Sequence, residues 1–227
     1  MNTPSKGGVK PLIVSDLHGR FHLLEKLLAD YPDRELILIG DFIDRGEQSK
    51  EVMQKVIELH KTSRATLLIG NHELLAKDAC VGNPGGLECW VSNGGNTTIQ
   101  SYAAHTPEGR EEFEAGLNYI LLNGLEWHTE GDVLIAHAGR PSRQVLGKTG
   151  YDQDHFWIRP NDKQHPLPLD IRFSVHGHTR MSQPTYVNEN AAWYIDLDAG
   201  NGDRFVLGNR IGIFDLETEM PFVLEAK

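Results

Sequence analysis

Hydrophobic residues in the first third of the chain repeat one pattern three times. A short apolar run is followed by a polar stretch containing glycine or asparagine, and then by a segment whose apolar residues recur at helical spacing. Each repeat predicts a strand, a loop and a helix. The predicted strands cover residues 9–14, 35–40 and 65–70, and the predicted helices cover 21–30, 49–61 and 74–79.

Consecutive strand-loop-helix units indicate a parallel sheet covered by helices, in which ligands bind outside the carboxyl ends of the strands. The polar loops of this chain occupy those ends. Beyond residue 130, apolar runs at 132–139 and 171–178 end in histidines, and 191–200 and 210–217 predict late strands of a second, antiparallel layer. We therefore expect an α/β fold.

The segment from about residue 80 to 130 has a different pattern. Turn-forming clusters such as GNPGG and SNGGN separate short stretches with helical character, of which 108–123 is an example. We expect a single domain over residues 1–227, in which about 80–130 forms a small cap over the edge of the sheet.

Composition narrows the possible partners. The 227 residues carry a formal net charge of −10, which disfavours a nonspecific nucleic-acid binder. No apolar run approaches the ~20 residues of a membrane span, and the N-terminal residues lack the apolar middle of a signal peptide. These features predict a cytoplasmic protein with no nucleic-acid or membrane partner, in which Cys80 and Cys89 are reduced.

Oxygen and imidazole donors follow five of the predicted strands. One such residue at a strand-to-helix turn is commonplace, but five sets delivered to one edge of a sheet predict a metal site. The absence of thiolates suits Mn²⁺, Fe or Zn²⁺ and disfavours a cysteine-type structural zinc site. The donors are Asp16 and His18, Asp41 and Asp44, Asn71 and His72, His137, and His176 and His178.

A bridging carboxylate would let these donors hold two cations. If Asp41 bridges, the first ion is held by Asp16, His18 and Asp41. The second is then held by Asp41, Asn71, His137 and His178. Two such ions would attract an anion in spite of the acidic chain. They would also lower the pKa of bound water and clamp both oxygens of a phosphoryl displacement.

The motifs SDLHG, GDFIDRG, GNHE, HAG and GHT, in this order, resemble those of the phosphoprotein phosphatases, part of the calcineurin-like metallophosphoesterases. The resemblance runs from residue 12 to about 200, and GDFIDRG followed by GNHE is highly specific. It implies a sandwich with a mixed β-sheet core flanked by helices and a small helical cap. The segment at 88–102 and the GHT motif resemble compact bacterial and phage members.

The resemblance also implies roles for single residues. His72 is the general acid, Asp44 orients it, and Arg45, Arg159 and Asn71 lie at the phosphate, beside two divalent ions for which Mn²⁺ is the first choice. The plainer alternatives are a structural ion pair for Arg45 and a surface position for Arg159. Arg140 is open between a third phosphate contact and a loop charge. His176 is expected to pack beside His178.

Three functions follow. We favour a metal-dependent phosphomonoesterase acting on phosphoserine and phosphothreonine, with phosphotyrosine or small phosphoesters as further substrates, by direct attack of a dimetal-bound hydroxide on phosphorus. The second is a symmetrical bis(5'-nucleosyl)-tetraphosphate hydrolase that uses the same centre on an anhydride. The third is a noncatalytic scaffold, which we disfavour because every expected donor is present.

Overall fold

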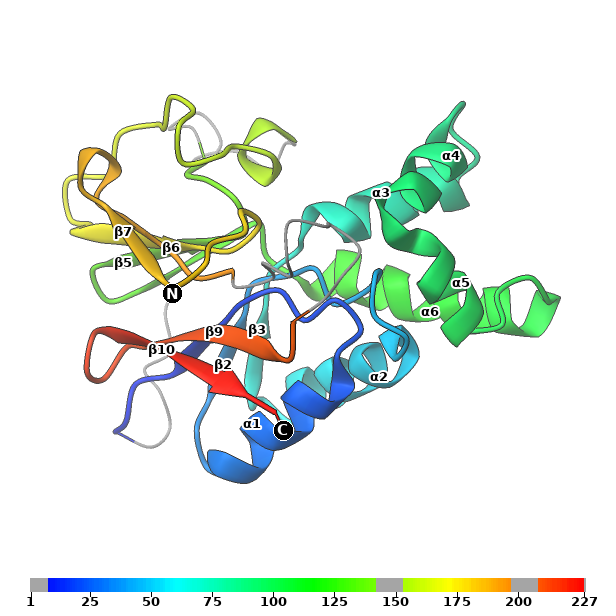
Figure 1. The fold of residues 1–227 in the computed structure, drawn as a ribbon, viewed down its shortest axis with the longest axis horizontal. Coiled ribbons are helices and arrows are strands. Elements are labelled where there is room, and N and C mark those ends of the chain that lie inside the picture. Colours follow the sequence, from blue (N-terminus) through cyan, green and yellow to red (C-terminus); the bar gives the residue numbers. More distant parts are fainter. Residues whose placement is uncertain (1–7, 142–152, 197–207, 227) are drawn as a thin grey trace.

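The computed structural model describes residues 8–141, 153–196 and 208–226. Two five-stranded sheets pack face to face, and helices cover the outer face of the first sheet (Figure 1). Both sheets mix parallel and antiparallel pairs. The predicted α/β sandwich with mixed sheets and flanking helices is therefore confirmed.

The first sheet has the strand order β10-β9-β1-β2-β3. The three strands of the N-terminal repeats, β1, β2 and β3, are parallel to one another. Strand β9 pairs with β1 in antiparallel orientation, and β10 pairs with β9 in the same way. The strands are β1 (Leu12–Val14), β2 (Leu36–Leu38), β3 (Ala65–Leu67), β9 (Arg210–Asp215) and β10 (Met220–Glu225). The connecting helices are α1 (Phe21–Asp30), α2 (Ser49–Lys61) and α3 (Asn71–Cys80), so two of the three helices have the predicted bounds.

The second sheet has the order β4-β5-β6-β8-β7. Its strands are β4 (Trp127–Glu130), β5 (Val133–Ala136), β6 (Phe173–His176), β7 (Thr185–Val187) and β8 (Ala192–Tyr194). The prediction that the two late strands form one antiparallel layer is wrong. One of them, β8, is parallel to β6 in the second sheet, and the other, β9, completes the first sheet beside β1. Residues 197–200 of the predicted strand lie outside the described residues.

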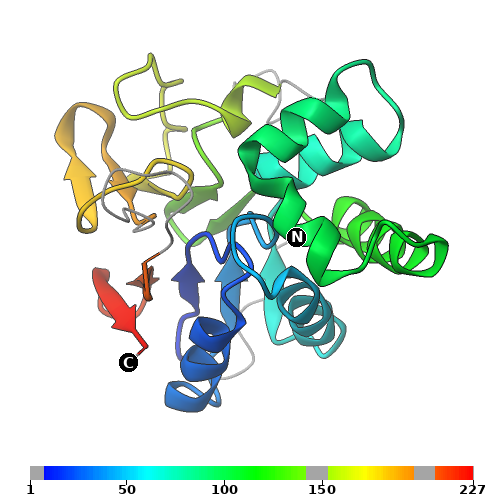
Figure 2. The same cartoon turned by 45° about the vertical axis from the view of Figure 1, so that its right-hand side comes forward.

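Several helices follow α3 along the chain, before strand β4 begins. They gather with α3 on one side of the molecule (Figure 2). They are α4 (Gly86–Trp90), the π-helical turn η1 (Val91–Gly95), α5 (Asn96–Ser101) and α6 (Pro107–Asn123). Thr106 caps the last of these by accepting a hydrogen bond from the backbone N–H of Gly109, and Pro107 occupies its first turn. Two short 3₁₀ turns, η2 (Gln153–Phe156) and η3 (Asn188–Asn190), complete the elements. The single domain with a cap over about 80–130 stays a prediction, with residues 127–130 forming strand β4.

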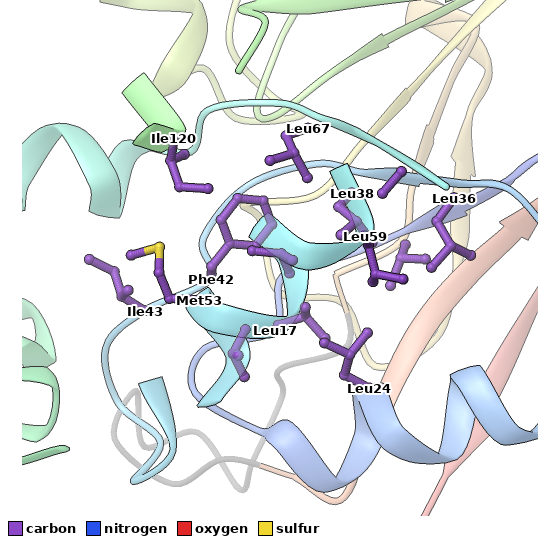
Figure 3. Close-up of a cluster of buried hydrophobic side chains, with 14 of the residues drawn as sticks. Leu17, Leu24, Leu36, Leu38, Phe42, Ile43, Met53, Leu59, Leu67 and Ile120 are labelled. Atoms are coloured by element: carbon purple, nitrogen blue, oxygen red, sulfur yellow. The ribbon is translucent and has the colours of Figure 1, made fainter. Parts of the chain in front are cut away.

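Alternating side chains along the strands make two cores. Leu12 and Val14 of β1 face the helices, in the hydrophobic cluster drawn in Figure 3, whereas Ile13 faces the second sheet. The inner faces of β5 and β6 supply the opposite wall with valine, isoleucine and phenylalanine side chains. This burial on both faces explains why the strands read as continuous apolar runs in the sequence.

Two negative predictions can be compared with the structure. Cys80 and Cys89 are both free thiols. Among the described residues, no helix has the length and apolar character needed to cross a bilayer.

Candidate metal centre

The loops that follow β1 and β2 are tied to each other through their backbones. The carbonyl oxygen of Asp41 accepts the N–H groups of Leu17 and His18 at 3.1 and 2.8 Å. The N–H of Gly46 in turn donates to the His18 carbonyl at 3.1 Å. A Cβ atom on Gly46 would lie 2.2 Å from that carbonyl oxygen, so the close approach requires glycine. The first two donor loops thus form one unit.

Backbone strain is concentrated in the predicted site. Of the nine non-glycine residues with positive φ in the described parts of the chain, five are predicted site residues. They are His18, Asp41, Asp44, Arg45 and His178. Left-handed conformations of such residues cost of order 1–3 kcal/mol each and persist where the surrounding contacts enforce them, commonly at functional sites. Their distribution points to these loops as the functional part of the molecule.

Hydrogen bonds fix which ring nitrogen carries the proton in two of the histidines. Nδ1 of His18 lies 2.9 Å from the carbonyl oxygen of Ile43, and Nδ1 of His137 lies 2.8 Å from that of Ile39. A carbonyl oxygen can only accept, so each Nδ1 carries the proton and each Nε2 presents a lone pair. Burial lowers the pKa of both imidazoles, that of His18 strongly, which keeps them neutral. Metal-binding histidines are commonly held in this way.

Several acceptor atoms converge on the Nε2 atom of His137. It lies 2.9 Å from Oδ1 of Asn71 and 3.5 Å from Oδ1 of Asp41. Asn71 Oδ1 is also 2.8 Å from Nδ1 of His178, whose own Nε2 is buried without a hydrogen-bond partner. The lone pair of His137 and the oxygens of Asn71 and Asp41 repel one another unless a cation lies among them.

Carboxylates crowd the same region. Burial, and then the negative charges of Asp196 and Asp41, raise the pKa of Asp16 well above its ordinary value. Burial acts in the same direction on Asp41, but the neighbouring His137 and His72 together with Arg45 leave the pKa of Asp41 below its ordinary value. Bound divalent cations would relieve the repulsion between these buried acids.

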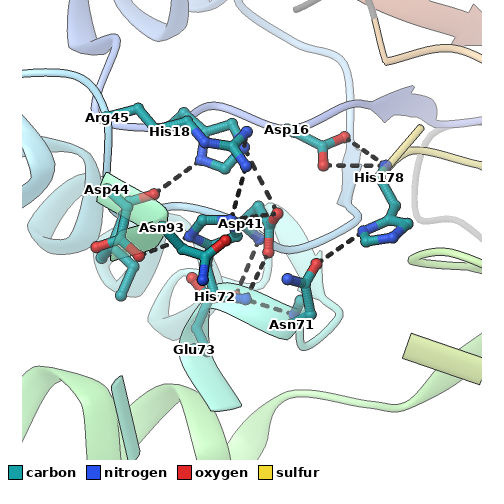
Figure 4. Close-up of polar contacts among 12 residues, drawn as sticks. Asp16, His18, Asp41, Asp44, Arg45, Asn71, His72, Glu73, Asn93 and His178 are labelled. Atoms are coloured by element: carbon teal, nitrogen blue, oxygen red, sulfur yellow. Dashed lines mark hydrogen bonds and ion pairs between the residues drawn. The ribbon is translucent and has the colours of Figure 1, made fainter. Parts of the chain in front are cut away.

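Two clusters of potential ligand atoms share Asp41. In the first, atoms of His18, Asp41 and His72 lie within 4.8 Å of one another, and in the second the same holds for Asp16, Asp41 and His137. Figure 4 shows Asp16, His18, Asp41 and Asn71 facing a common centre. The donor set is oxygen and neutral imidazole, so the residues fit a pair of hard or borderline divalent cations. His178 is in neither cluster. Its ring joins the group through Asn71, and its backbone N–H donates to Asp16 Oδ1 at 3.0 Å.

Arg45 and Asp44 flank His72, a member of the first cluster. Nδ1 of His72 donates to Oδ2 of Asp44 at 2.6 Å, which leaves Nε2 on the side of the ring away from Asp44. The Arg45 guanidinium lies 2.9 Å from this Nε2 and 2.6 Å from Nε2 of His18. Burial lowers the pKa of His72, but the charge of Asp41 and the hydrogen bond with Asp44 outweigh it, and the pKa lies above the ordinary histidine value. Because a guanidinium group can only donate, Nε2 of His72 accepts from Arg45 in this structure, and the ring is a potential proton donor only when Nε2 is protonated as well.

The buried side chain of Glu73 links the loop after β2 to the loop after β3. Its carboxylate accepts the backbone N–H groups of Asp41, Phe42 and Gly70, each at 2.9 Å. A Cβ atom on Gly70 would lie 2.1 Å from Oδ1 of Asp41, so only glycine permits this approach. Burial and the charge of Asp41 raise the pKa of Glu73 to about 7. The side chain holds two donor loops at a fixed distance.

We expect Glu73→Gln to destabilise the fold. The amide replaces an acceptor oxygen by a donor, so at least one buried N–H loses its partner, at a cost of about 1–3 kcal/mol in the free energy of unfolding. Urea unfolding of the metal-free protein measures this change. Glu111→Gln, on an exposed position of α6, is the matched control. Equal stability of the two variants would contradict the linking role of Glu73.

The remaining predicted residues occupy different settings. Arg159 is exposed, and burial, followed by the nearby His137 and Arg159, lowers the pKa of His178 to about 3. His176 is fully buried, with Nδ1 at 3.0 Å from the Ala136 carbonyl oxygen and Nε2 at 2.8 Å from Ser174 Oγ, so both ring nitrogens are engaged within the protein. Arg140 is buried near Tyr194 and His176 and is bonded to none of the predicted ligands.

Sequence reasoning assigned no role to Glu73, and it missed three further residues of this region. Asp196 follows strand β8 and adds a third carboxylate, and its position after an apolar run was the available signal. Trp90 and Thr98 reach Asp44 from the helical segment, far along the chain from GDFIDRG. Nothing in their local sequence pattern identified them.

Comparison with known proteins agrees with this geometry. The sequence pattern of the calcineurin-like phosphoesterases matches residues 9–208. A bis(5'-nucleosyl)-tetraphosphatase PrpE [asymmetrical] from Bacillus velezensis is 26% identical, over 92% of this chain and 93% of that protein. Serine/threonine-protein phosphatase 2 from Escherichia coli is 27% identical, over 85% and 88% of the two chains. A solved Saccharomyces cerevisiae protein serine/threonine phosphatase has a TM-score of 0.61 at 16% identity, over 99% of this chain and 82% of that one.

Proposed function

Because this chain belongs to the calcineurin-like phosphoesterase family, we propose that it is a metal-dependent phosphomonoesterase that acts on phosphoserine and phosphothreonine. Membership makes it a hydrolase of phosphoesters, and the choice of substrate is our proposal. The observation that carries it is the His72–Asp44 pair, held at 2.6 Å beside Arg45. A proton donor fixed at this point serves a strongly basic leaving group, such as the alkoxide of serine or threonine.

The ligand assignment within this proposal keeps Asp41 as the bridge. Asp16, His18 and Asp41 would hold one cation, and the other would be held by Asp41, Asn71, His137 and His178. When bound, two such ions supply an activated water, Lewis acidity and the positive charge that an acidic chain lacks. We take Mn²⁺ as the first choice, since oxygen and imidazole donors suit it.

The remaining groups act on the substrate. Arg45 and Arg159 bind phosphate oxygens as guanidinium forks, and the Asn71 amide lies close enough to add a donor. His72 gives the proton at Nε2 to the departing oxygen. Asp44 holds Nδ1–H of that ring, which fixes the orientation of Nε2 and stabilises the protonated imidazole before transfer.

The name of the Bacillus velezensis relative supports a second candidate, hydrolysis of a dinucleoside tetraphosphate. That relative is named for asymmetrical cleavage, in contrast to the symmetrical cleavage that the sequence suggested. A phosphoanhydride has a less basic leaving group, so such a reaction depends less on His72.

Initial rates of the metal-stripped protein decide between the two. We expect phosphate release from a phosphothreonine peptide only after addition of Mn²⁺, with Fe²⁺ and Zn²⁺ tested in parallel. We expect slow turnover of diadenosine tetraphosphate under the same conditions. The reverse preference would move the protein to the nucleotide hydrolases, and the nucleotide products would then distinguish asymmetrical from symmetrical cleavage. No turnover of either substrate would instead support the third function, a noncatalytic scaffold.

A further inference from the structure

The carboxylate of Asp44 is surrounded by donors from three helices. Oδ2 accepts Nδ1–H of His72, from α3, at 2.6 Å. The indole N–H of Trp90, at the end of α4, lies 2.9 Å from Oδ2 and 3.0 Å from Oδ1. Oδ1 also accepts the hydroxyl of Thr98, in α5, at 2.7 Å. Asp44, Trp90 and Thr98 are all buried.

These contacts determine how the carboxylate can turn. Trp90 and Thr98 both donate, so both oxygens of Asp44 act as acceptors. The indole N–H spans both oxygens, and the hydroxyl holds the one that does not bind the imidazole. Rotation of the carboxylate would break both bonds and release the His72 ring.

Thr98 also supports the backbone at the same residue. Its Oγ1 accepts the N–H of Asp44 at 2.9 Å, and Asp44 has a φ of 74°. The hydroxyl of Ser49 lies 3.1 Å from that N–H and 3.1 Å from Thr98 Oγ1. Side-chain contacts from α5 and α2 therefore hold the strained turn that presents the carboxylate.

Trp90 itself is held rigidly. Its ring stacks on Phe113 of α6 with centroids 5.4 Å apart and planes 10° apart. Gly95 also lies against the ring, since a Cβ atom there would come within 2.7 Å of three indole carbon atoms. Between Trp90 and Thr98 the chain kinks at Gly94, whose φ of 106° is not helical.

We propose that Trp90 and Thr98 are positioning residues that orient the general acid His72 through Asp44, an inference that rests on the proposed phosphomonoesterase function. In that case α4 and α5 contribute to catalysis by orienting His72. The plainer reading is that Trp90 merely satisfies its N–H as buried tryptophans commonly do. The two readings differ in which substrates a variant affects.

Two substitutions remove the donors and keep the packing. Trp90→Phe retains a ring against Phe113 and loses the N–H, and Thr98→Val retains the branched shape and loses the hydroxyl. We expect kcat on a phosphothreonine peptide to fall about tenfold or more in each, since general acid catalysis contributes about 10²–10⁴-fold and misorientation forfeits part of it. We expect KM to change little. With p-nitrophenyl phosphate, whose leaving group needs little protonation, kcat should stay within about twofold.

A third variant reaches the indole indirectly. Gly95 has φ −63°, which alanine adopts without strain, so Gly95→Ala acts through its contact with the Trp90 ring. We expect the same pattern as in the other two variants: kcat falls on the phosphothreonine peptide and changes little on p-nitrophenyl phosphate. Trp193→Phe, in the core between the sheets, is the matched control and should leave both rates unchanged.

A readout without turnover completes the test. In metal-free protein, NMR of the His72 ring should show a strongly downfield Nδ1 proton in the hydrogen bond to Asp44. This signal should be lost or broadened in Trp90→Phe and Thr98→Val. Three results would overturn the inference. They are an unchanged Nδ1 proton signal, an equal fall in kcat on both substrates, and an unchanged ratio of the two kcat values. If the unaltered protein turns over neither substrate with Mn²⁺, the proposed function fails, and the ring signal alone then decides the positioning role.

Discussion

Asp41→Asn should abolish metal binding and phosphoester hydrolysis together. Asp41 belongs to both clusters of potential ligand atoms, with Oδ1 at 3.5 Å from His137 Nε2 and Oδ2 at 3.5 Å from His18 Nε2. A neutral amide offers one weak oxygen ligand in place of two charged ones, so it cannot bridge two cations. Changes in groups that only support metal ligands cost about 10–100-fold in affinity or activity. Loss of a ligand shared by both ions should therefore lower the metal affinity and the activity by more than about 100-fold each.

The fold should survive this substitution. Asp41 Oδ1 accepts the backbone N–H of His72 at 3.0 Å, and the asparagine oxygen can accept the same bond. Metal content measured by mass spectrometry after dialysis against Mn²⁺, together with initial rates, tests the expectation. Asp33→Asn, an exposed change in the loop before β2, is the control. An Asp41→Asn protein that loses both ions and still turns over, or that keeps both ions, would contradict the bridging role.

Sequence pattern was sufficient for the strands and loops that carry the donors. Each N-terminal strand is apolar on both faces because one face meets the helices and the other meets the second sheet. Parallel strands place their carboxyl ends at one edge, so the residues after β1, β2 and β3 could be assigned to one site from sequence alone.

The assignment of strands to sheets was not readable from the chain. The strands β8 and β9 have similar apolar patterns, yet one adds to β6 and the other to β1. The sheet that each strand joins depends on pairing with residues far away in the chain and on which face it presents to the common core. A short window of sequence contains neither kind of information. The contacts of Trp90 and Thr98 with Asp44 were hidden for the same reason, because they join residues 46 and 54 positions apart.

The same limit applies to the division of labour within GDFIDRG. The spacing of Asp41 and Asp44 shows two carboxylates after one strand, and only the resemblance to phosphatases separated a metal ligand from an orienting group. In the structure, Asp41 faces three imidazoles, those of His18, His72 and His137. Asp44 is bonded to His72, Trp90 and Thr98 and is in neither cluster of ligand atoms. The turn between them, with positive φ at both aspartates, points the two side chains at different partners.

His72→Asn should retain the metal ions and lose most turnover on alkyl phosphates. Asn71, the adjacent residue, is a proposed ligand, whereas Nδ1 of His72 is bonded to Asp44 and Nε2 lies against Arg45. Removing the ring deprives the leaving oxygen of its proton donor and leaves the ligands in place. General acid catalysis contributes about 10²–10⁴-fold, and we expect a loss in that range in kcat for a phosphothreonine peptide.

Leaving-group dependence makes this expectation specific. The loss should be far smaller for p-nitrophenyl phosphate and for diadenosine tetraphosphate, because their leaving groups are weaker bases than an alkoxide. The measurements are kcat on the three substrates and the bound metal content, with His105→Asn as an exposed control. Because His72 lies within 4.8 Å of His18 and Asp41, loss of metal in His72→Asn would assign the ring as a ligand. Full turnover of the phosphopeptide with metal retained would remove His72 as the general acid, and with it the observation that favours a monoesterase over a tetraphosphatase.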